Sequence, residues 1–527
     1  MKSYYTPVRP EPGRTHAGLG PSLGPADGRP HAVVIGSGFG GLASAIRLGV
    51  KGYRVTVLEK LDAVGGRAYV WRQDGYTFDA GPTIITAPHL LEELWTLCGQ
   101  RMSDHITLKP MDPFYRIRFD DGSHFDYCGD TIRMRDEVAR FSPEDVDGYD
   151  RFMVYAEKCR KLGFEGLGTV PFDSVGDLLA AIPSMVRMRA WASIHSRVAS
   201  YIRNPKLRIV FSFHPLLIGG NPFSVTSAYA LINALEKQWG VHWAMGGTGA
   251  LAQGLARLIQ EQGGTIALNS EVRKIQVTDG RAQGVELADG RSLQADLVVS
   301  NADVAWTYKH LVAPEHRRHW TEQRIQKGRY SMSLFVWYFG TDRRFESVPH
   351  HMLVLGSRYR ELLRDIFKRH HLAQDFSLYL HRPTASDPSM APPGCDTFYA
   401  LSPVPHLDSG TDWAEHGERY RQAVQEALER SVLPGLGAHI VTSRVTTPLD
   451  FQNRLLSYKG AAFGLEPLLL QSAWFRPHNR SEDIENLYMV GASTHPGAGV
   501  PGVLMSAMAL DKVIPLASEF RAAARNR

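Results

Sequence analysis

A glycine-rich turn at residues 36–41 restricts the possible folds of this 527-residue chain more than any other segment. The apolar run at residues 31–35 leads directly into the turn and is typical of a buried parallel strand. Residues 42–50 then repeat their apolar positions at helical spacing, and a second apolar run follows at residues 54–58. This order of strand, tight turn, helix and strand within about 30 residues predicts a βαβ unit.

The glycines of the turn are spaced as a nucleotide-binding loop requires. Gly36 permits the tight turn, Gly38 lets the backbone approach a diphosphate, and Gly41 lets the helix pack closely on the strand. Backbone N–H groups and the helix dipole then face the phosphate charge. Glu59 ends the second strand, where it can bind an adenosine ribose and would repel a 2′-phosphate. The pattern favours FAD or NAD over NADP, and the alternative is a purely structural turn.

Further glycine-rich turns follow this unit and recur near the C-terminal end. Residues 60–67 end in Gly-Gly-Arg, which either forms an ordinary surface turn or supplies N–H donors and a cation, Arg67, for a diphosphate. Residues 78–83 expose another stretch of backbone. Residues 491–503 lead into a helix that we expect to begin at about Pro501, and a helix N-terminus stabilises negative charge. The alternative is that this last loop only turns the chain.

Composition excludes several classes of protein. Hydrophobic residues make up 43% of the chain and charged residues 21%, which are globular values. A net charge of +5 over this length gives no basis for nucleic-acid binding. Four cysteines without a CxxC pair predict neither a disulfide framework nor a cysteine-rich metal site, and indicate a reducing cytosol. No apolar run reaches the roughly 20 residues that span a bilayer, so we expect a soluble or peripheral protein.

The rest of the chain reads as a succession of strands and helices after a leader. Residues 1–30 are rich in Pro and Gly and lack the apolar segment of a secretory signal, which predicts a disordered leader. Alternating apolar and polar residues predict a β meander at residues 265–290. Further strands are predicted at residues 297–299, 331–339, 376–380 and 487–490, and helices at residues 251–262, 415–432 and 501–516.

Several of these segments together resemble a known family. Residues 36–67, 79–83 and 490–506 resemble the superfamily of FAD-dependent amine oxidases and carotenoid desaturases. The run from Gly491 to Gly502 is similar to the C-terminal flavin motif of bacterial phytoene desaturases. Four shorter segments are also similar to that family, at residues 375–381, 402–407, 462–467 and 475–477. The resemblance extends from about residue 31 to residue 516.

The resemblance implies an α/β fold built around a Rossmann-like FAD-binding domain of the glutathione-reductase and amine-oxidase type. This domain is expected to be discontinuous and to contain residues 31–110, 240–305 and 460–527. A helical, membrane-facing substrate region is expected at residues 111–239. An inserted substrate domain with a mixed sheet is expected at residues 306–459.

The resemblance also implies FAD as the cofactor and assigns residues to it by motif position. Glu59 would bind the adenosine ribose, and Val272 would contact the adenine through its backbone. The turn at residues 36–41, with Gly66 and Arg67, would follow the diphosphate, while residues 81–83 and 499–503 would lie near the isoalloxazine ring. The predicted cofactor-binding residues are Gly36, Ser37, Gly38, Phe39, Gly40, Gly41, Glu59, Lys60, Gly66, Arg67, Gly81, Pro82, Thr83, Val272, Gly491, Ala492, Gly499, Val500, Gly502 and Val503.

A basic segment at residues 183–208 predicts contact with a lipid surface. It contains Arg and Lys but no acidic residue, and drawn as one helix it places Met188, Trp191, Ile194 and Val198 on one side. A basic face opposite an apolar face with a Trp is typical of an interfacial helix, and the alternative is a solvated basic helix. The resemblance favours the membrane, because a C40 polyene must be taken from the bilayer. We therefore expect a cytoplasmic protein bound peripherally to the inner membrane.

The resemblance implies an oxidoreductase acting on CH–CH bonds, which desaturates 15-cis-phytoene through phytofluene and ζ-carotene to neurosporene or lycopene. Because residues 245–250 lack the strand and the acid of a second nucleotide motif, a diffusible electron acceptor such as quinone or oxygen is expected. Alternatives on the same scaffold are a later-pathway desaturase of hydroxyneurosporene or methoxyneurosporene, a carotenoid isomerase, a ketolase, and an enzyme of polar amines. A non-catalytic lipid-binding escort protein is an alternative of another class. The number of desaturation steps and the oligomeric state stay open.

No catalytic acid or base is assigned from the sequence. Asp375, His381 and His495 are candidates only because they adjoin motifs. A metal site is not expected: His350 and His351 have no carboxylate pattern nearby, and adjacent side chains on a strand point to opposite faces.

Overall fold

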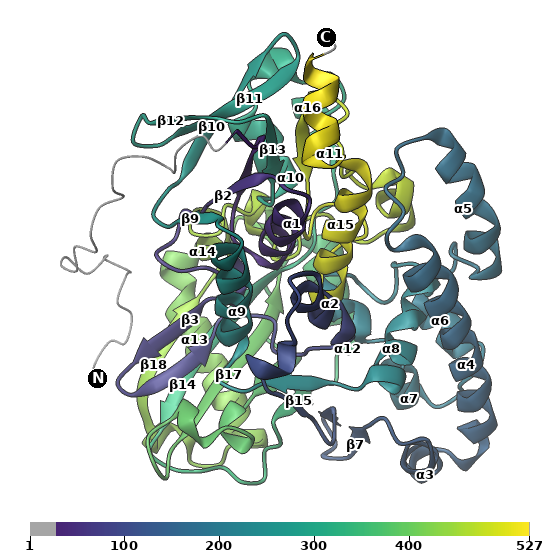
Figure 1. Ribbon diagram of the computed structural model, residues 1–527. Helices are drawn as coiled ribbons and strands as arrows, with labels where there is room; N and C mark the ends of the chain where they lie inside the picture. The colour runs from purple at the N-terminus through teal and green to yellow at the C-terminus, as the bar shows by residue number, and fades with distance from the viewer. Residues whose placement is uncertain (1–27, 526–527) are drawn as a thin grey trace.

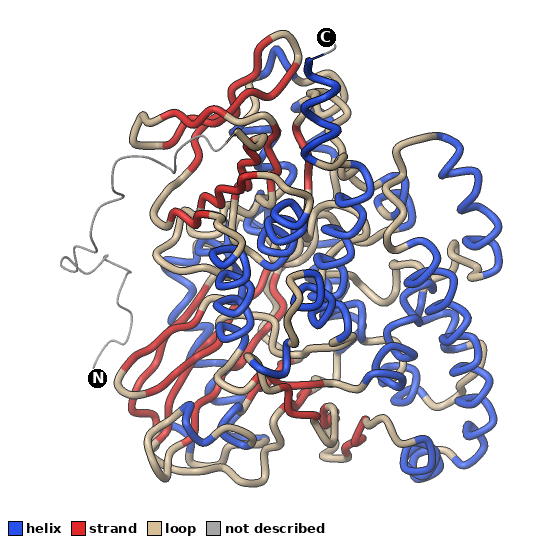
Figure 2. Tube along the Cα trace, viewed as in Figure 1, coloured by secondary structure: helices blue, strands red, loops and turns tan. Residues whose placement is uncertain are grey.

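The computed structural model describes residues 28–525, so most of the predicted leader, residues 1–30, lies outside the described residues. Two large sheets dominate the molecule, with helices between them and along one side (Figures 1 and 2). The first sheet has five parallel strands in the order β19-β13-β1-β2-β9. Their bounds are β1 His31–Ile35, β2 Arg54–Leu58, β9 Thr265–Ala267, β13 Leu297–Ser300 and β19 Leu487–Met489.

The predicted βαβ unit is confirmed at the centre of this sheet. Helix α1 (Phe39–Val50) joins β1 to β2, which pair in parallel from His31 with Arg54 to Ile35 with Leu58. Helices α9 (Thr248–Glu261) and α15 (Val500–Val513) pack against α1. Segments from both ends of the chain and from its middle therefore share one core, because their apolar strands are buried on both faces.

The predicted meander is confirmed from residue 272 on, as a three-stranded antiparallel sheet of β10 (Val272–Thr278), β11 (Arg281–Leu287) and β12 (Ser292–Gln294). Its first predicted residues, 265–267, instead form β9 of the parallel sheet. The meander packs over one face of the five-stranded sheet. Two small two-stranded sheets complete the region, formed by β3 (Val70–Gln73) with β4 (Tyr76–Asp79) and by β5 (Leu108–Pro110) with β8 (His242–Ala244).

The second large sheet has seven strands in the order β18-β14-β17-β16-β15-β6-β7. It is mixed, because β15 pairs with β6 in parallel while the other pairs are antiparallel. Helix α13 (Trp413–Ser431) covers one face. Apolar side chains from the helices of residues 131–239, the helical side of the molecule, pack on the other face. The strand bounds are β6 Tyr115–Arg118, β7 His124–Tyr127, β14 Ser333–Thr341, β15 His351–Val354, β16 Leu378–His381, β17 Asp396–Val404 and β18 Ile440–Thr446.

Strands β6 and β7 come from the region that was expected to be helical, so this sheet joins the two predicted substrate regions. The remaining helices of residues 131–239 lie together on the right of Figure 1. They are α3 Thr131–Phe141, α4 Val146–Cys159, α5 Val175–Arg187, α6 Ile194–Ala199, α7 Pro205–Val210 and α8 Leu231–Trp239. The other helices are α2 His89–Leu97, α10 Val304–Trp306, α11 Glu322–Lys327, α12 Tyr359–Arg364, α14 Pro448–Asn453 and α16 Ala517–Arg525.

The prediction of one amphipathic helix at residues 183–208 is wrong. Helix α5 ends at Arg187, Arg189 adopts a left-handed backbone conformation with φ of 51°, and the short helices α6 and α7 follow. Met188, Ile194 and Val198 are buried in the protein core, not presented to a lipid surface. Helical periodicity identifies an apolar face but does not tell whether protein or lipid will cover it.

Among the described residues, no helix combines the length and apolar character needed to cross a bilayer.

Candidate functional site

A cavity of about 570 Å³ lies between the two large sheets. The turn after β1, the end of β2, residues 80–84, the start of β10 and the C-terminal loop before α15 all line it. All the predicted cofactor-binding residues line this cavity except Ser37, Gly41 and Gly491. The structure thus brings together side chains that are separated by more than 400 positions in the sequence.

The three exceptions lie directly behind the cavity wall. Ser37 donates from its backbone N and its Oγ to Oε2 of Glu59, at 2.8 and 2.6 Å. A Cβ on Gly41 would lie 2.1 Å from the carbonyl oxygen of Gly36, so only glycine lets α1 approach the turn this closely. Gly491 lies next to the turn, since a Cβ on Gly40 would approach its Cα to 3.1 Å.

The carboxylate of Glu59 is buried and held in one orientation. Its Oε2 accepts both hydrogen bonds from Ser37, and its Oε1 accepts one from the backbone N of Leu61 at 2.8 Å. Each carboxylate oxygen can accept two hydrogen bonds, so Oε1 keeps capacity for a ligand in the cavity. This arrangement suits a diol such as a ribose.

Arg67 places a cationic group at the cavity with part of its hydrogen-bonding capacity unused. Its Nη2 donates to Oγ of Ser457 at 3.0 Å, while its Nε is buried without a partner. Burial lowers the pKa of Arg67, and the nearby carboxylate of Asp303 partly offsets this. A buried donor without a partner costs about 1–3 kcal/mol, which an anionic ligand would recover. Together with the glycine turn, these groups fit the diphosphate of FAD.

Asn301 and Arg476 are site residues that the sequence reasoning missed. Asn301 follows β13, and its side chain lies against the turn, with Nδ2 at 3.5 Å from the carbonyl oxygen of Gly36. Arg476 is buried and donates to the carbonyl oxygens of Ala492 at 2.7 Å and Thr494 at 3.2 Å, which holds the C-terminal loop in place. The signal for Asn301 was its position after a parallel strand, where ligands gather. The signal for Arg476 was the segment at residues 475–477, which is similar to the family but was not assigned to the cofactor.

The other half of the cavity is apolar. Its lining comes from the helical side and from the seven-stranded sheet, and includes Met185, Met188, Leu216, Leu217, Leu231, Met332, Leu334, Val336, Leu401 and Phe463. Polar groups interrupt this surface, among them the carboxylate of Glu236 and the hydroxyls of Thr83, Tyr229, Tyr338, Tyr379 and Tyr399. Oγ of Thr83 lies 2.9 Å from the hydroxyl of Tyr379 and 2.6 Å from that of Tyr399.

The three candidate catalytic residues lie in different surroundings. Asp375 forms an ion pair with Arg358 at 2.8 Å and does not line the cavity. His495 lines the cavity and donates a hydrogen bond from its Nε2 to the carbonyl oxygen of Leu167 at 3.1 Å. Burial lowers its pKa to about 3. His381 lies outside the cavity lining, in a buried group with two other histidines.

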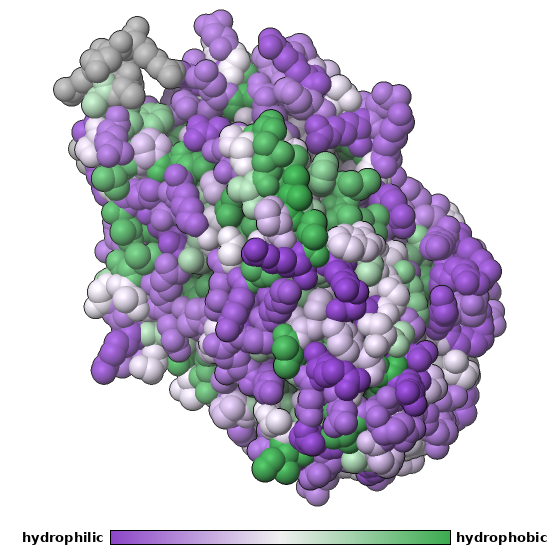
Figure 3. All heavy atoms as spheres, turned by 90° about the vertical axis from the view of Figure 1, so that its right-hand side faces the viewer, coloured by the Kyte–Doolittle hydropathy of each residue, from purple (hydrophilic) through white to green (hydrophobic). Residues whose placement is uncertain are grey.

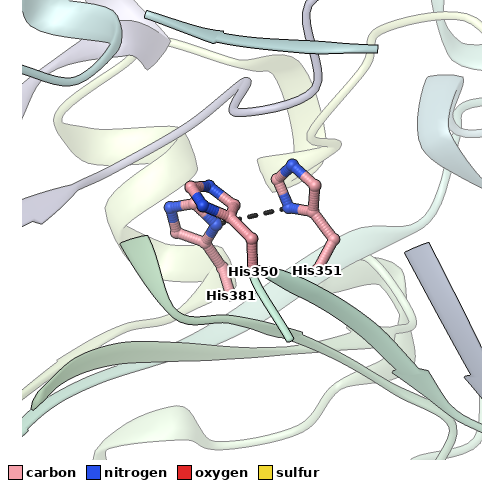
Figure 4. A group of neighbouring side chains, drawn as sticks. All are labelled: His350, His351 and His381. Atoms are coloured by element: carbon pink, nitrogen blue, oxygen red, sulfur yellow. Dashed lines mark hydrogen bonds between the residues drawn. The ribbon is translucent and has the colours of Figure 1, made fainter. Parts of the chain in front are cut away.

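This histidine group consists of His350, His351 and His381 (Figure 4). The expectation that His350 and His351 point apart is wrong, because their ring centroids are 4.4 Å apart. Strand β15 begins at His351, so His350 precedes the regular pleat and is free to turn toward its neighbour. One nitrogen from each of the three rings lies within 4.8 Å of the others.

Comparison with known proteins gives a consistent result. The family model described as "Flavin containing amine oxidoreductase" matches residues 39–509. A neurosporene-forming phytoene desaturase of Cereibacter sphaeroides is 50% identical over 506 residues, which cover 95% of this chain and 98% of the relative. A lycopene-forming phytoene desaturase of a Paracoccus species is 49% identical over 484 residues, covering 92% and 97%.

Solved structures agree at the level of the fold. Cyclohexylamine oxidase from Brevibacterium oxydans superimposes with a TM-score of 0.58 at 17% sequence identity, covering 95% of this chain and 100% of that protein. The α/β architecture with a mixed sheet is therefore the amine-oxidase fold.

Proposed function

This chain belongs to the flavin-containing amine oxidoreductases and, within them, to the bacterial phytoene desaturases, and on this basis we propose that it desaturates 15-cis-phytoene. The reaction proceeds through phytofluene and ζ-carotene to neurosporene or lycopene in carotenoid biosynthesis. FAD is the cofactor.

One observation carries the proposal: a single cavity joins an apolar space to the nucleotide cradle, by which we mean the glycine turn at residues 36–41 with Glu59, Arg67 and the C-terminal loop before α15. A phytoene molecule offers no charge or hydrogen-bonding group, so its recognition depends on shape and apolar contact. The apolar half of this cavity fits the hydrocarbon.

The residues of the cradle would hold FAD in an extended form. Glu59 would accept hydrogen bonds from the ribose, and the backbone N–H groups at the start of α1 with Arg67 would face the diphosphate. Residues 81–83 and 499–503 would lie along the isoalloxazine ring, next to the N-terminus of α15. When bound, FAD accepts a hydride from the substrate, which is chemistry that no side chain supplies.

The protein contributes to this reaction by positioning the substrate beside the cofactor in an apolar environment. The apolar lining excludes water, so the substrate lies beside the cofactor without a competing solvent. The loop held by Arg476 and the turn held by Asn301 keep both walls of the cradle in register.

We propose that the protein takes its substrate from the cytoplasmic face of the inner membrane, through the surface of α5. Four apolar side chains at helical spacing are exposed there: Val175 62%, Leu179 61%, Ile182 44% and Val186 53%. Trp191, just beyond the helix, is 65% exposed, and Arg187 and Arg189 are exposed beside it. Figure 3 faces this side of the molecule and has hydrophobic side chains gathered at the height of α5.

The position of α5 supports this route. Met185 of α5 and Met188 just after it line the cavity, while the outer side of the helix exposes apolar surface. Exposed apolar patches of this kind mark interaction surfaces, and adjacent Arg side chains attract anionic lipid. The helix thus separates a lipid-compatible exterior from the substrate cavity.

We propose a diffusible electron acceptor such as quinone or oxygen. Residues 245–250 connect β8, a strand of a two-stranded antiparallel sheet, to α9, and Gly246 donates to Asp387 at 2.9 Å. This turn therefore lacks the parallel strand of a second nucleotide site.

Product analysis in a host that accumulates phytoene tests the proposal. We expect phytoene to fall and neurosporene or lycopene to rise, and the ratio of the two products identifies the number of steps. Untouched phytoene together with conversion of a hydroxylated or later carotenoid would favour a later-pathway enzyme, and hydrogen peroxide formed with amines would favour an amine oxidase. A purified protein that binds no FAD would favour an escort protein.

A further inference from the structure

A continuous chain of hydrogen bonds leaves the apolar cavity at Thr83. Its Oγ lies 2.9 Å from the hydroxyl of Tyr379, and that hydroxyl lies 2.7 Å from Nδ1 of His351. All three residues are buried. The chain therefore links a group at the cavity surface to the histidine group, which lies outside the cavity lining.

The histidine group continues this chain toward the protein surface. Nδ1 of His351 lies 3.4 Å from Nδ1 of His381, as the dashed line in Figure 4 marks. The ring of His350 packs against both, with centroids 4.4 Å from His351 and 4.8 Å from His381. Nδ1 of His350 lies 2.8 Å from Oγ of Ser386, which is partly exposed. Polar groups thus lie between the cavity and the solvent, joined by hydrogen bonds as far as His381 and by ring contact between the histidines at His350.

The proposed reaction needs such a path. Forming a C=C bond breaks two C–H bonds: one hydrogen leaves with its electron pair as hydride, and the other leaves as a proton while its electron pair becomes the new π bond. An apolar cavity cannot solvate a proton, because burying an isolated charge in such surroundings costs many kcal/mol. The proton must therefore pass to a polar group at the cavity wall.

We infer that Thr83, Tyr379 and His351 form a proton relay that removes this proton from the cavity, an inference that rests on the proposed function. The substrate proton passes to Oγ of Thr83 as the Thr83 hydroxyl proton passes to Tyr379. The Tyr379 hydroxyl proton passes to Nδ1 of His351, which becomes an imidazolium and releases the proton through the histidine group to solvent. The step consumes no oxidant beyond FAD, which takes the hydride.

The hydrogen-bonding capacity of each group agrees with this direction. The distances allow Tyr399 to donate to Thr83, Thr83 to donate to Tyr379, and Tyr379 to donate to Nδ1 of His351, and in this assignment each hydroxyl donates once. Nε2 of His351 then carries the ring proton. Burial lowers the pKa of His351 to about 3, so the ring is neutral before the reaction and does not retain a proton that it receives.

A divalent cation is the other occupant that three buried imidazoles suggest. The nitrogen of His351 that faces His381 already bonds the Tyr379 hydroxyl, and no carboxylate belongs to the group. These contacts favour the relay, and the metal becomes an outcome of the test.

The test follows reduction of the flavin in a single anaerobic turnover. FAD-loaded protein is mixed with phytoene in liposomes, in H₂O and in D₂O, as wild type and as Tyr379→Phe and His351→Gln. Wild type is expected to show a solvent isotope effect on flavin reduction. Both variants are expected to reduce flavin about 100-fold more slowly, the scale of a lost proton-transfer group, with unchanged KM and unchanged flavin content.

A second readout does not depend on turnover. In protein labelled with ¹⁵N-histidine, the NMR signal of His351 Nδ1 is expected to shift in Tyr379→Phe, because its hydrogen-bond donor is removed. Tyr420→Phe is the matched control. It removes a buried hydroxyl of α13 that bonds Ser402 at 2.8 Å, on the other face of the same sheet, and its flavin reduction should match wild type.

Each outcome decides the inference. Wild-type rates and isotope effects in Tyr379→Phe and His351→Gln would overturn it, and so would a stoichiometric divalent metal in purified wild type that His351→Gln loses. Melting temperature and flavin content identify a variant that fails to fold, and then the other variant decides. If wild type leaves phytoene unchanged, the proposed function fails, and an unshifted His351 signal in Tyr379→Phe separately refutes the hydrogen-bond chain.

Discussion

Gly40 shows how little space separates the two ends of the chain. A Cβ at this position would lie 2.7 Å from Oδ1 of Asn301 and 3.1 Å from Cα of Gly491. The first of these is the far end of a side chain, but the second is backbone and cannot move without shifting the C-terminal loop. One methyl group would therefore separate the two walls of the cradle.

We predict that Gly40→Ala loses most of its bound FAD. Flavin absorbance of the purified protein measures this loss. Gly176→Ala is the control, because a Cβ there meets only Oγ of Ser174, at an ordinary 3.4 Å, near the start of an exposed helix. Full flavin content in Gly40→Ala would contradict the close contact with Gly491.

His495 illustrates how a buried residue makes stability depend on pH. Its pKa is lowered from 6.5 to about 3 by burial, and Arg476 adds to this effect. Below pH 6.5 the unfolded chain binds a proton that the folded chain does not, so the free energy of unfolding falls as the pH falls from 6.5 toward 3. Above pH 6.5 the ring is neutral in both states and contributes no pH dependence.

We predict that His495→Gln loses less stability than wild type between about pH 6.5 and pH 5.5. The difference should be about 1 kcal/mol, because the unfolded histidine is already half protonated at pH 6.5 and almost fully protonated at pH 5.5. Gln can keep a hydrogen bond to the carbonyl oxygen of Leu167, which limits other changes. Urea unfolding at both pH values measures the slopes, and equal slopes would contradict the prediction.

At the scale of elements, α5 has two different faces. Its inner side contributes Met185 to the cavity, and its outer side exposes apolar residues to solvent. A capping box of Ser174 and Asp177 begins the helix, so the outer residues are held at regular helical spacing. An apolar helix face that the protein itself leaves uncovered needs another partner, and a lipid surface suits it.

We predict that Leu179→Ser weakens binding to anionic vesicles by about tenfold, since burying one large apolar side chain is worth about 1.5–3 kcal/mol. Co-sedimentation with vesicles measures the change. Val441→Ser is the control: it removes an apolar side chain that is 48% exposed on β18, far from α5 in Figure 1. An equal loss in both variants would mean that α5 has no special role.

At the scale of the whole molecule, the two ends of the chain meet in one sheet. Strand β1 lies beside β13, which lies beside β19, and α15 packs on α1. The cavity residues of both ends therefore face one another only in the folded protein. A ligand that contacts both ends binds the folded state alone and must stabilise it.

We predict that FAD raises the melting temperature of the FAD-free protein. At a concentration of about 100 times Kd, the gain is about 2.7 kcal/mol. Riboflavin, which lacks the diphosphate and adenosine, should give a smaller shift. Gly40→Ala should respond little to FAD, and a full response in this variant would show that the cradle tolerates a side chain.

The sequence by itself determined the elements whose patterns are local. The strand–turn–helix order around Gly36 to Gly41, the meander and the C-terminal helix follow from apolar periodicity and glycine spacing, which act over a few residues. The tertiary structure decided which apolar faces meet protein. Met188 and Val198 are buried in the core, while Leu179 is exposed. Apolar periodicity is the same for a helix face covered by protein and for one left exposed, so the sequence could not distinguish them.

Contacts between distant segments were also decided only by the fold. Arg476 bonds the C-terminal loop, Asn301 lies beside the glycine turn, and His350 and His351 lie beside His381, and each of these contacts joins segments that are distant in the sequence. His350 turned toward His351 because the strand begins one residue later than an extended pattern suggests. Side-chain direction at a strand end depends on the neighbouring strands, and these come from elsewhere in the chain.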